Sequence, residues 1–70
     1  MTFKLCEAHF GPDGMEHTAT ISEFHTLEEA VAAGRELVEQ YPHLDLVVHV
    51  PEDQRGEEEY PGEKEWVDVF

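Results

Sequence analysis

The sequence of 70 residues is poor in several residue types that carry familiar functions. Its single cysteine, Cys6, excludes a disulfide within the chain, and nothing in the cysteine content indicates an oxidising compartment. Only four residues are Lys or Arg, so nucleic acid and anionic membranes are poor direct partners. The apolar runs are too short to cross a bilayer, and no basic segment followed by an apolar run marks a signal peptide. We therefore expect a soluble cytoplasmic protein.

Signatures of catalysis and of metal binding are also missing. The glycine-containing segment 11–14 is too short for a phosphate-binding loop and lacks its Lys. Cys6 and His9 are three residues apart on a predicted strand, which points them to opposite faces. Five histidines occur without the close spacings typical of zinc sites: His9, His17, His25, His43 and His49. We expect no enzyme, no metal site, no cofactor and no pocket for a small molecule.

Acidic residues dominate what is present. Seventeen Asp and Glu residues stand against four Lys and Arg residues, which gives a formal net charge of -13 at pH 7. Self-repulsion opposes compaction in a chain of this size, which buries only about 60% of its unfolded surface. A strongly basic protein surface is the partner that this charge favours, with fast and salt-sensitive association.

Two-residue alternation predicts four strands, at residues 2–10, 17–24, 44–51 and 65–70. In the second of them, Ala19 and Ile21 share one face. The sequence GPDG at residues 11–14 predicts a turn that joins the first two strands into a hairpin.

A helix is predicted between the second and third strands. Thr26 is a favourable N-cap, and Glu29 three residues later completes a capping box. Pro42 ends the helix near Tyr41. Gly34 lies within the apolar stripe, which indicates that the helix approaches a sheet closely at this point. The stripe repeats every three or four residues: Leu27, Ala30, Val31, Gly34, Leu37, Val38 and Tyr41.

The element order ββαββ predicts a single domain over residues 1–70. Its simplest arrangement is an α+β two-layer sandwich. A mainly antiparallel four-stranded sheet of order 2-1-3-4 carries the one helix on one face. The competing arrangement places the third strand directly beside the second through a right-handed crossover.

One face of this sheet would lack a helix. Trp66 would be a large exposed aromatic side chain on it and could mark an interface. The alternative, in which a bulge shifts the register and Trp66 packs in the core, is favoured because Trp is mostly buried. The predicted residues of this face are otherwise mostly small or polar: Lys4, Cys6, Ala8, Thr18, Thr20, Ser22, Val47, His49, Trp66 and Phe70.

The candidate partner-binding residues are carboxylates with few basic neighbours. Four glutamates on the predicted helix share Arg35 as their one basic neighbour. The connection at residues 51–65 is denser still in carboxylates. Carboxylates on a rigid scaffold can occupy the Lys- and Arg-lined grooves by which proteins bind DNA, so we favour DNA mimicry over a merely solvated surface. The candidates are Glu28, Glu29, Glu36, Glu39, Glu52, Asp53, Glu57, Glu58, Glu59, Glu63 and Glu65.

The whole chain resembles the small, acidic, phage-encoded anti-CRISPR proteins of the DNA-mimic type. The resemblance rests on length, on a compact ββαβ-type layout and on uncompensated Glu and Asp residues. It implies an inhibitor that acts in the cytoplasm of a host bacterium on a CRISPR surveillance complex, with type I-C systems as the suggested target. The acidic face would fill the basic channel that recognises the protospacer-adjacent motif or duplex DNA. Some anti-CRISPR proteins lock subunits sterically instead, so both mechanisms stay open.

Two alternatives remain beside this interpretation. The sequence HTLEEAVAAGREL at residues 25–37 resembles the strand-to-helix passage of HicB-type antitoxins, in which an acidic unit masks a basic ribonuclease toxin. No DNA-binding segment follows it here, which departs from that pattern. The other alternative is a small acidic interaction protein that dimerises through Trp66 and Phe70. We favour a monomer, with the dimer as the alternative.

Overall fold

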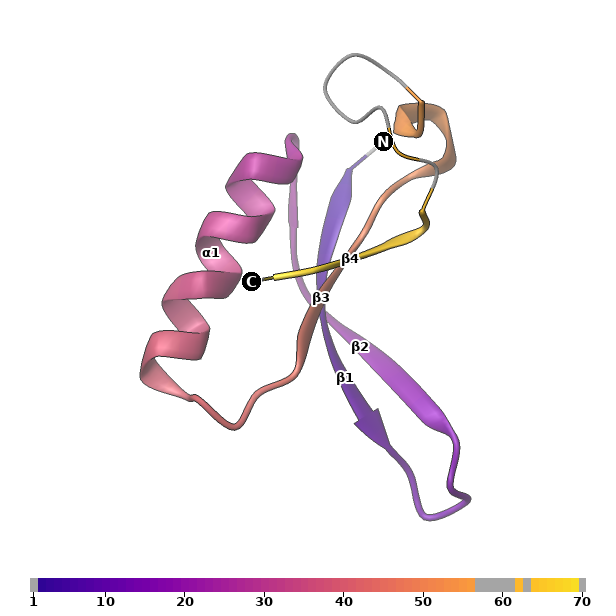
Figure 1. The fold of residues 1–70 in the computed structure, drawn as a ribbon, viewed down its shortest axis with the longest axis vertical. Helices are drawn as coiled ribbons and strands as arrows, with labels where there is room; N and C mark the ends of the chain where they lie inside the picture. Colours follow the sequence, from indigo (N-terminus) through magenta and orange to yellow (C-terminus); the bar gives the residue numbers. More distant parts are fainter. Residues whose placement is uncertain (1, 57–61, 63, 70) are drawn as a thin grey trace.

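The computed structural model describes residues 2–56, 62 and 64–69 as a two-layer α+β fold. The four described strands form one antiparallel sheet in the order β2-β1-β3-β4, and helix α1 covers one face (Figure 1). The predicted fold class and strand order are confirmed. The competing crossover is wrong, because β1 lies between β2 and β3. The elements are β1 (Phe3–Phe10), β2 (Glu16–Phe24), α1 (Leu27–Gln40), β3 (Leu46–His49), the 3-10 turn η1 (Glu52–Gln54) and β4 (Trp66–Asp68).

The helix begins and ends where the local sequence predicts. Thr26 has an extended backbone, and its Oγ1 accepts a hydrogen bond from the Glu29 N–H at 3.1 Å. The Thr26 hydroxyl in turn donates to Oε1 of Glu29 at 3.0 Å. At the other end, the Tyr41 N–H donates to the Leu37 carbonyl at 2.7 Å, and the helix ends at the residue before Tyr41. Pro42 follows, and its ring disfavours a helical conformation at Tyr41.

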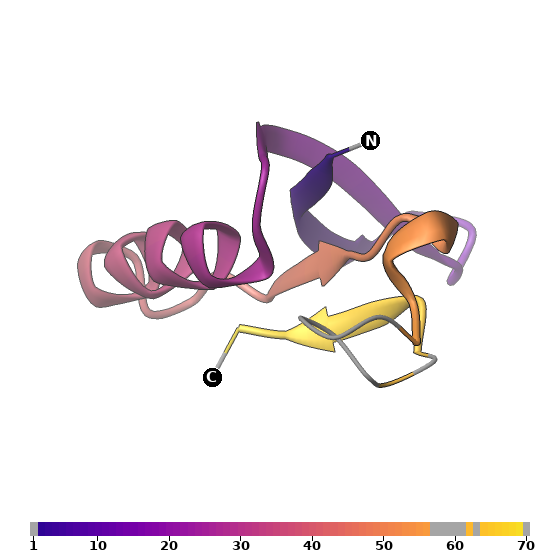
Figure 2. The same ribbon diagram turned by 90° about the horizontal axis from the view of Figure 1, so that it is seen from above.

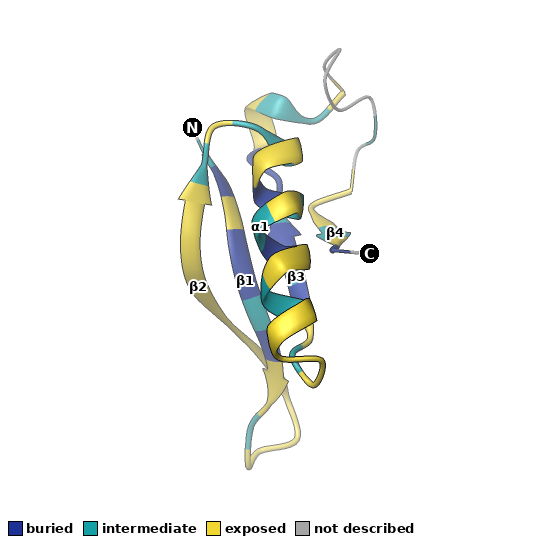
Figure 3. Ribbon diagram, turned by 90° about the vertical axis from the view of Figure 1, so that its left-hand side faces the viewer, coloured by how far each residue is buried: buried dark blue, intermediate teal, exposed yellow. Residues whose placement is uncertain are grey.

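The hydrophobic core lies between α1 and the covered face of the sheet (Figure 3). Side chains from the strands and the segments that follow them supply its largest members: Phe3, Leu5, Leu46, Val48, Val50 and Val69. The helix contributes Ala30, which is fully buried, and Gly34. An ideal Cβ on Gly34 would lie 2.8 Å and 2.9 Å from the two Cγ atoms of Val69. The predicted close approach of the helix at Gly34 is therefore confirmed.

A β-bulge in β2 changes which of its residues share a face. Leu5 lies opposite Ser22, but the next residue, Cys6, lies opposite Thr20. Ile21 is the extra residue, and it is 46% exposed. Directly opposite residues share a face, so Ser22 lies on the covered face with Leu5. The predicted placement of Ser22 on the uncovered face is therefore wrong.

The bulge lies in β2 rather than near β4, so Trp66 remains on the uncovered face. The pairing of β3 with β4 is regular and sets Trp66 opposite His49. Trp66 is 39% exposed, and its ring meets the His49 ring edge-on at a centroid distance of 4.7 Å. The favoured prediction that Trp66 packs in the core is therefore wrong. Phe70, predicted beside it, lies outside the described residues.

Two small residues of the uncovered face are nevertheless buried. Cys6 and Ala8 have relative exposures of 3% and 8%. They belong to β1, which is flanked by β2 on one side and β3 on the other. Neighbouring side chains shield short ones at such central positions; the Thr20 hydroxyl, for example, lies 3.8 Å from the Cys6 sulfur.

The turn between β1 and β2 is closed by several hydrogen bonds. The Gly11 N–H donates to the Met15 carbonyl at 2.9 Å, and Gly14 adopts the positive φ of 77° that favours glycine. The Asp13 carboxylate accepts a hydrogen bond from the Met15 N–H at 3.0 Å and contacts Nε2 of His17 at 3.2 Å. The predicted turn at residues 11–14 is thus confirmed, with Asp13 as its anchor.

These contacts predict how Asp13 titrates. The Met15 N–H, followed by His17, holds the pKa of the Asp13 carboxyl below its usual value of 3.8. A depressed folded-state pKa gives a stabilising contribution that is present above the unfolded pKa and is lost as pH falls through the folded pKa. We expect the Asp13 carboxyl carbon, followed by NMR, to titrate with a midpoint below 3.8, and the Met15 amide to follow it. Asp13→Asn keeps an acceptor but should remove this transition from Met15; an Asp13 midpoint at or above 3.8 would contradict the proposed cause.

Candidate partner-binding surfaces

Helix α1 presents a stripe of exposed carboxylates on the side away from the core. At 3.6 residues per turn they fall within an arc of about 100°, and they extend over about 16 Å of the helix axis. The capping box orients the start of this stripe, and the core contacts of α1 hold the helix against the sheet. These residues, hereafter the helix glutamates, are Glu28, Glu29, Glu36 and Glu39, all exposed.

The helix glutamates are poorly compensated by positive charge. In the part of the chain that the structure describes, the salt bridges join His17 to Asp13, and Glu65 to His49 and Arg55; none involves the helix glutamates. Arg35, on the same helix, directs its Nε to the Val69 carbonyl at 3.3 Å. Arg35, the one Lys or Arg residue of α1, therefore binds the segment after β4.

The helix dipole makes part of this arrangement unfavourable. Glu28 and Glu29 lie in the first turn, where the partial positive charge of the helix N-terminus stabilises a carboxylate. Glu39 lies in the last turn, which holds no basic residue and where a negative charge is destabilising. The position of Glu39 therefore reduces helix stability, and it strengthens the negative potential along the outer face.

The remaining predicted residues lie elsewhere. Glu52 and Asp53 are exposed on η1, which lies on the opposite side of the molecule from α1 (Figure 2). Glu65 precedes β4, with its Oε1 2.9 Å from Nε2 of His49 and 4.0 Å from an Arg55 nitrogen, so it is partly neutralised. The predicted carboxylates therefore do not form one continuous surface. Glu57, Glu58, Glu59 and Glu63 lie outside the described residues.

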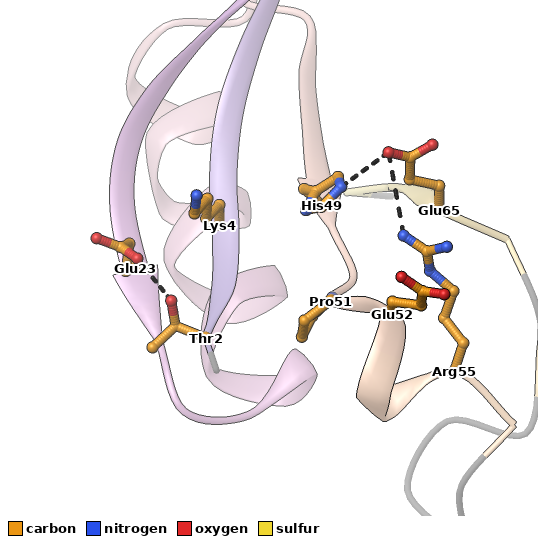
Figure 4. Close-up of a pocket in the computed structure, with 8 residues that line it drawn as sticks. All are labelled: Thr2, Lys4, Glu23, His49, Pro51, Glu52, Arg55 and Glu65. Atoms are coloured by element: carbon orange, nitrogen blue, oxygen red, sulfur yellow. Dashed lines mark hydrogen bonds and ion pairs between the residues drawn. The ribbon is translucent and has the colours of Figure 1, made fainter.

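An open pocket of about 510 Å³ lies beside η1 on the uncovered face of the sheet (Figure 4). Its wall at η1 is fixed by Arg55, whose Nε and a terminal nitrogen donate to the Val50 carbonyl at 3.1 Å and 3.0 Å. Its volume falls in the range of about 300–1,000 Å³ that is typical of small-ligand sites, so the expectation that no such pocket exists is wrong. The lining residues are Thr2, Lys4, Glu23, His49, Pro51, Glu52, Arg55 and Glu65.

The pocket was missed because its residues come from distant parts of the sequence. Lys4 and Arg55 supply two of the chain's four Lys and Arg residues, but they come together only in the folded chain, so no sequence pattern indicated the pocket. Three carboxylates face them in the lining: Glu23, Glu52 and Glu65. The mixture of signs favours neither a simple anion nor a simple cation.

Neither a metal-binding cluster nor a membrane-spanning helix occurs among the residues that the structure describes. Among the described residues, no three His, Cys, Asp or Glu side chains are grouped so as to hold a metal ion. No helix in the described ranges combines the length and apolar character needed to cross a membrane. Comparison of the chain with protein-family models, curated proteins and solved structures returned no match. Inference about function therefore rests on the charges and geometry of the chain itself.

Proposed function

We propose that this chain is an acidic inhibitor that docks on the nucleic-acid-binding surface of a basic protein and competes with its DNA. The helix glutamates carry the proposal: they are exposed, lie on a helix packed against the sheet, and have no salt-bridge partner within the described ranges. They belong to a chain with a net charge of -13. Such a potential favours association with a basic surface and disfavours direct binding of nucleic acid.

The spacing of the carboxylates bears on the mode of competition. Duplex DNA carries one negative charge per about 1.7 Å of axis, and each strand one per about 3.4 Å. The helix glutamates place four charges over about 16 Å, which is sparser than either. Carboxylates elsewhere on the chain therefore contribute to the potential. This supports occupation of a basic channel by overall charge, without a match to each phosphate.

The partner that follows from the anti-CRISPR resemblance is a CRISPR surveillance complex of type I, with type I-C as the first to test. Its channel for the protospacer-adjacent motif or duplex DNA is the surface on which an acidic helix would compete. A basic ribonuclease toxin is the alternative that follows from the HicB-type resemblance. Both partners are basic nucleic-acid-binding proteins, so a separate assay with each of them is needed to distinguish the two.

We expect the purified protein to displace labelled duplex DNA from a type I surveillance complex, measured by fluorescence anisotropy. The inhibition constant should rise steeply between about 50 and 200 mM salt, because exposed charges are progressively screened. A control arm measures RNA cleavage by a HicA-type toxin in the presence of the protein. Inhibition of the toxin alone would favour the antitoxin hypothesis over a CRISPR partner. If the protein inhibited neither the surveillance complex nor the toxin at low salt, the proposed function would be rejected.

A further inference from the structure

The longest strand of the sheet lies at its edge. β2 has nine residues, and it pairs with β1 on one side only among the described strands. All of its residues are exposed except Phe24, which is partly buried. The opposite edge is β4, which has three residues. A long exposed edge presents unpaired backbone groups to an added strand, and a short edge presents few.

The hydrogen-bond pattern of the hairpin shows which residues of β2 direct their backbone outward. The Gly11 N–H donates to the Met15 carbonyl, so this pair is hydrogen-bonded. Hydrogen-bonded and non-hydrogen-bonded pairs alternate along an antiparallel ladder. Thr18 and Ala8 form a non-hydrogen-bonded pair. The Ala8 N–H accordingly points away from β2 and donates to the Asp45 carbonyl on the other side of β1 at 2.8 Å. Thr18 therefore directs its own N–H and C=O to the free edge.

The outer part of β2 has little of the protection common at natural sheet edges. The strand contains no Lys and no Pro, and its bulge falls at Ile21, beyond the run Glu16–Thr20. Thr and Ile favour an extended backbone. The turn of the hairpin reaches past the end of α1 (Figure 3), and every residue of the run Glu16–Thr20 is exposed. Glu16–Thr20 is thus a regular, accessible template for another strand.

We propose that the outer edge of β2 pairs with an extended, cationic strand of the partner. The charge around the edge selects this occupant. Residues 5–34 contain no Lys or Arg, and Glu7, Asp13 and Glu16 lie on the outer part of the hairpin. At the other end of β2, Glu23 lies opposite Lys4, so the negative charge gathers around the outer run Glu16–Thr20. A second copy of this chain would bring another net charge of -13 to the edge and is disfavoured.

This inference rests on the proposed function, because the added strand belongs to the same basic partner. In Figure 3, β2 lies beside α1 in the view that faces the helix, so one partner can reach both. The helix glutamates would then supply long-range attraction, and β2 would fix the orientation through directional backbone hydrogen bonds. Strand addition to a sheet edge is a common mode of peptide recognition, in which main-chain hydrogen bonds give affinity.

The test uses a capped peptide of about eight residues with alternating Lys and Thr, a length typical of strands. We expect it to bind the whole protein, with NMR shift changes concentrated at Thr18 and Thr20. Thr18→Pro removes an outward N–H together with the Thr side chain, proline is tolerated at a sheet edge, and the net charge is unchanged. It should weaken peptide binding by about tenfold or more, the equivalent of one or two net hydrogen bonds. Circular dichroism and thermal melting of this variant check that it folds.

A second comparison does not depend on how the variant folds. A peptide of the same sequence with N-methyl groups on the amides of both edges keeps its charge but loses its main-chain donors. We expect the parent protein to bind it at least about tenfold more weakly. Equal binding of both peptides, or shift changes centred on α1, would overturn strand pairing. If the protein formed a concentration-dependent dimer that Thr18→Pro abolished, the strand that pairs with β2 would belong to a second copy of this chain and not to a cationic partner.

The two proposals fail in different ways. If neutral substitutions on α1 abolish DNA competition while Thr18→Pro does not affect it, the proposed function stands and strand pairing is rejected. If the peptide pairs with β2 but the protein displaces no DNA from a basic partner, strand pairing stands and the proposed function is rejected.

Discussion

The triple variant Glu28→Gln, Glu36→Gln and Glu39→Gln is expected to bind its basic partner about 10- to 100-fold more weakly than the parent chain. Each exposed charge contributes about 0.5–1 kcal/mol, and each 1.4 kcal/mol changes affinity about tenfold. The association rate should fall more than the dissociation rate rises, because the lost term is long-range attraction. The anisotropy competition at low salt gives the affinity, and stopped-flow mixing gives the rates. Glu29 is left unchanged because it pairs with the N-cap Thr26.

A matched control separates the helix face from total charge. The variant Glu52→Gln, Asp53→Asn and Asp68→Asn removes the same number of charges from exposed positions on η1 and on β4, where Asp68 lies opposite Val47 on the uncovered face of the sheet. We expect it to weaken binding by less than about threefold at the same salt concentration, since its charges lie outside the proposed contact. Equal losses in the two variants would show that net charge alone drives binding. A larger loss of affinity in the control variant would show that the partner contacts the side of the molecule that carries η1.

The helix variant should also keep or raise stability. Its three glutamates have no salt-bridge partner in the described part of the chain, so no stabilising pair is broken. Glu39→Gln removes a negative charge from the C-terminal turn, where the dipole opposes it, and this gain offsets the loss from Glu28→Gln in the first turn, where the dipole stabilises a carboxylate. Glu and Gln have similar helix propensities. A variant that lost both binding and thermal stability would indicate that the glutamates support the fold.

Gly34→Ala is expected to lower the free energy of unfolding by about 1–3 kcal/mol, the usual cost of overpacking a core. At an ordinary helix position the same change would stabilise by about 1 kcal/mol. Here the new methyl group would lie 2.8 Å from a Cγ of Val69 and 3.1 Å from Cδ1 of Leu5. Val69 is fully buried, and its carbonyl accepts the Arg35 Nε hydrogen bond, so it has little freedom to move aside.

Thermal melting measures this effect, with a fall in the midpoint of about 4–8 °C per kcal/mol for a domain of this size. Ala32→Gly, on the exposed face of α1, calibrates the propensity cost of glycine in the same helix. A double-mutant cycle with Val69→Ala tests the cause, because the shortened side chain makes room for the methyl group. Gly34→Ala should then cost less in the Val69→Ala background than in the parent chain. An increase in the melting temperature for Gly34→Ala alone would contradict the close approach.

The features of α1 that the sequence predicted correctly depend on local signals. Thr26 and Glu29 bond to each other within one turn, and Pro42 acts on the residue before it. Gly34 was informative because a glycine within an apolar stripe has few causes other than close packing. The exposure of the helix glutamates follows from the same periodicity. Each of these inferences needs only neighbours within about one helical turn.

The features that were predicted wrongly depend on contacts between strands. Both faces of β2 carry small side chains, so its alternation specifies the register only weakly, and the bulge at Ile21 left no pattern to detect. Trp66 was assigned to the core from its average burial, although the register of β3 with β4 places it opposite His49. The pairing of Glu65 with His49 and Arg55 also requires knowledge of which strands are neighbours.

The central position of β1 has a consequence for folding kinetics. The hairpin of β1 with β2 and the helix α1 are built from local contacts, which can form within microseconds. The pairing of β1 with β3 instead joins residues as distant as Lys4 and His49, and the chain between them must be closed into a loop first. Substitutions in β3, such as Leu46→Ala or Val48→Ala, should therefore slow folding. Changes near the hairpin turn should also slow folding, because contacts that form before the transition state lower the folding rate when they are lost.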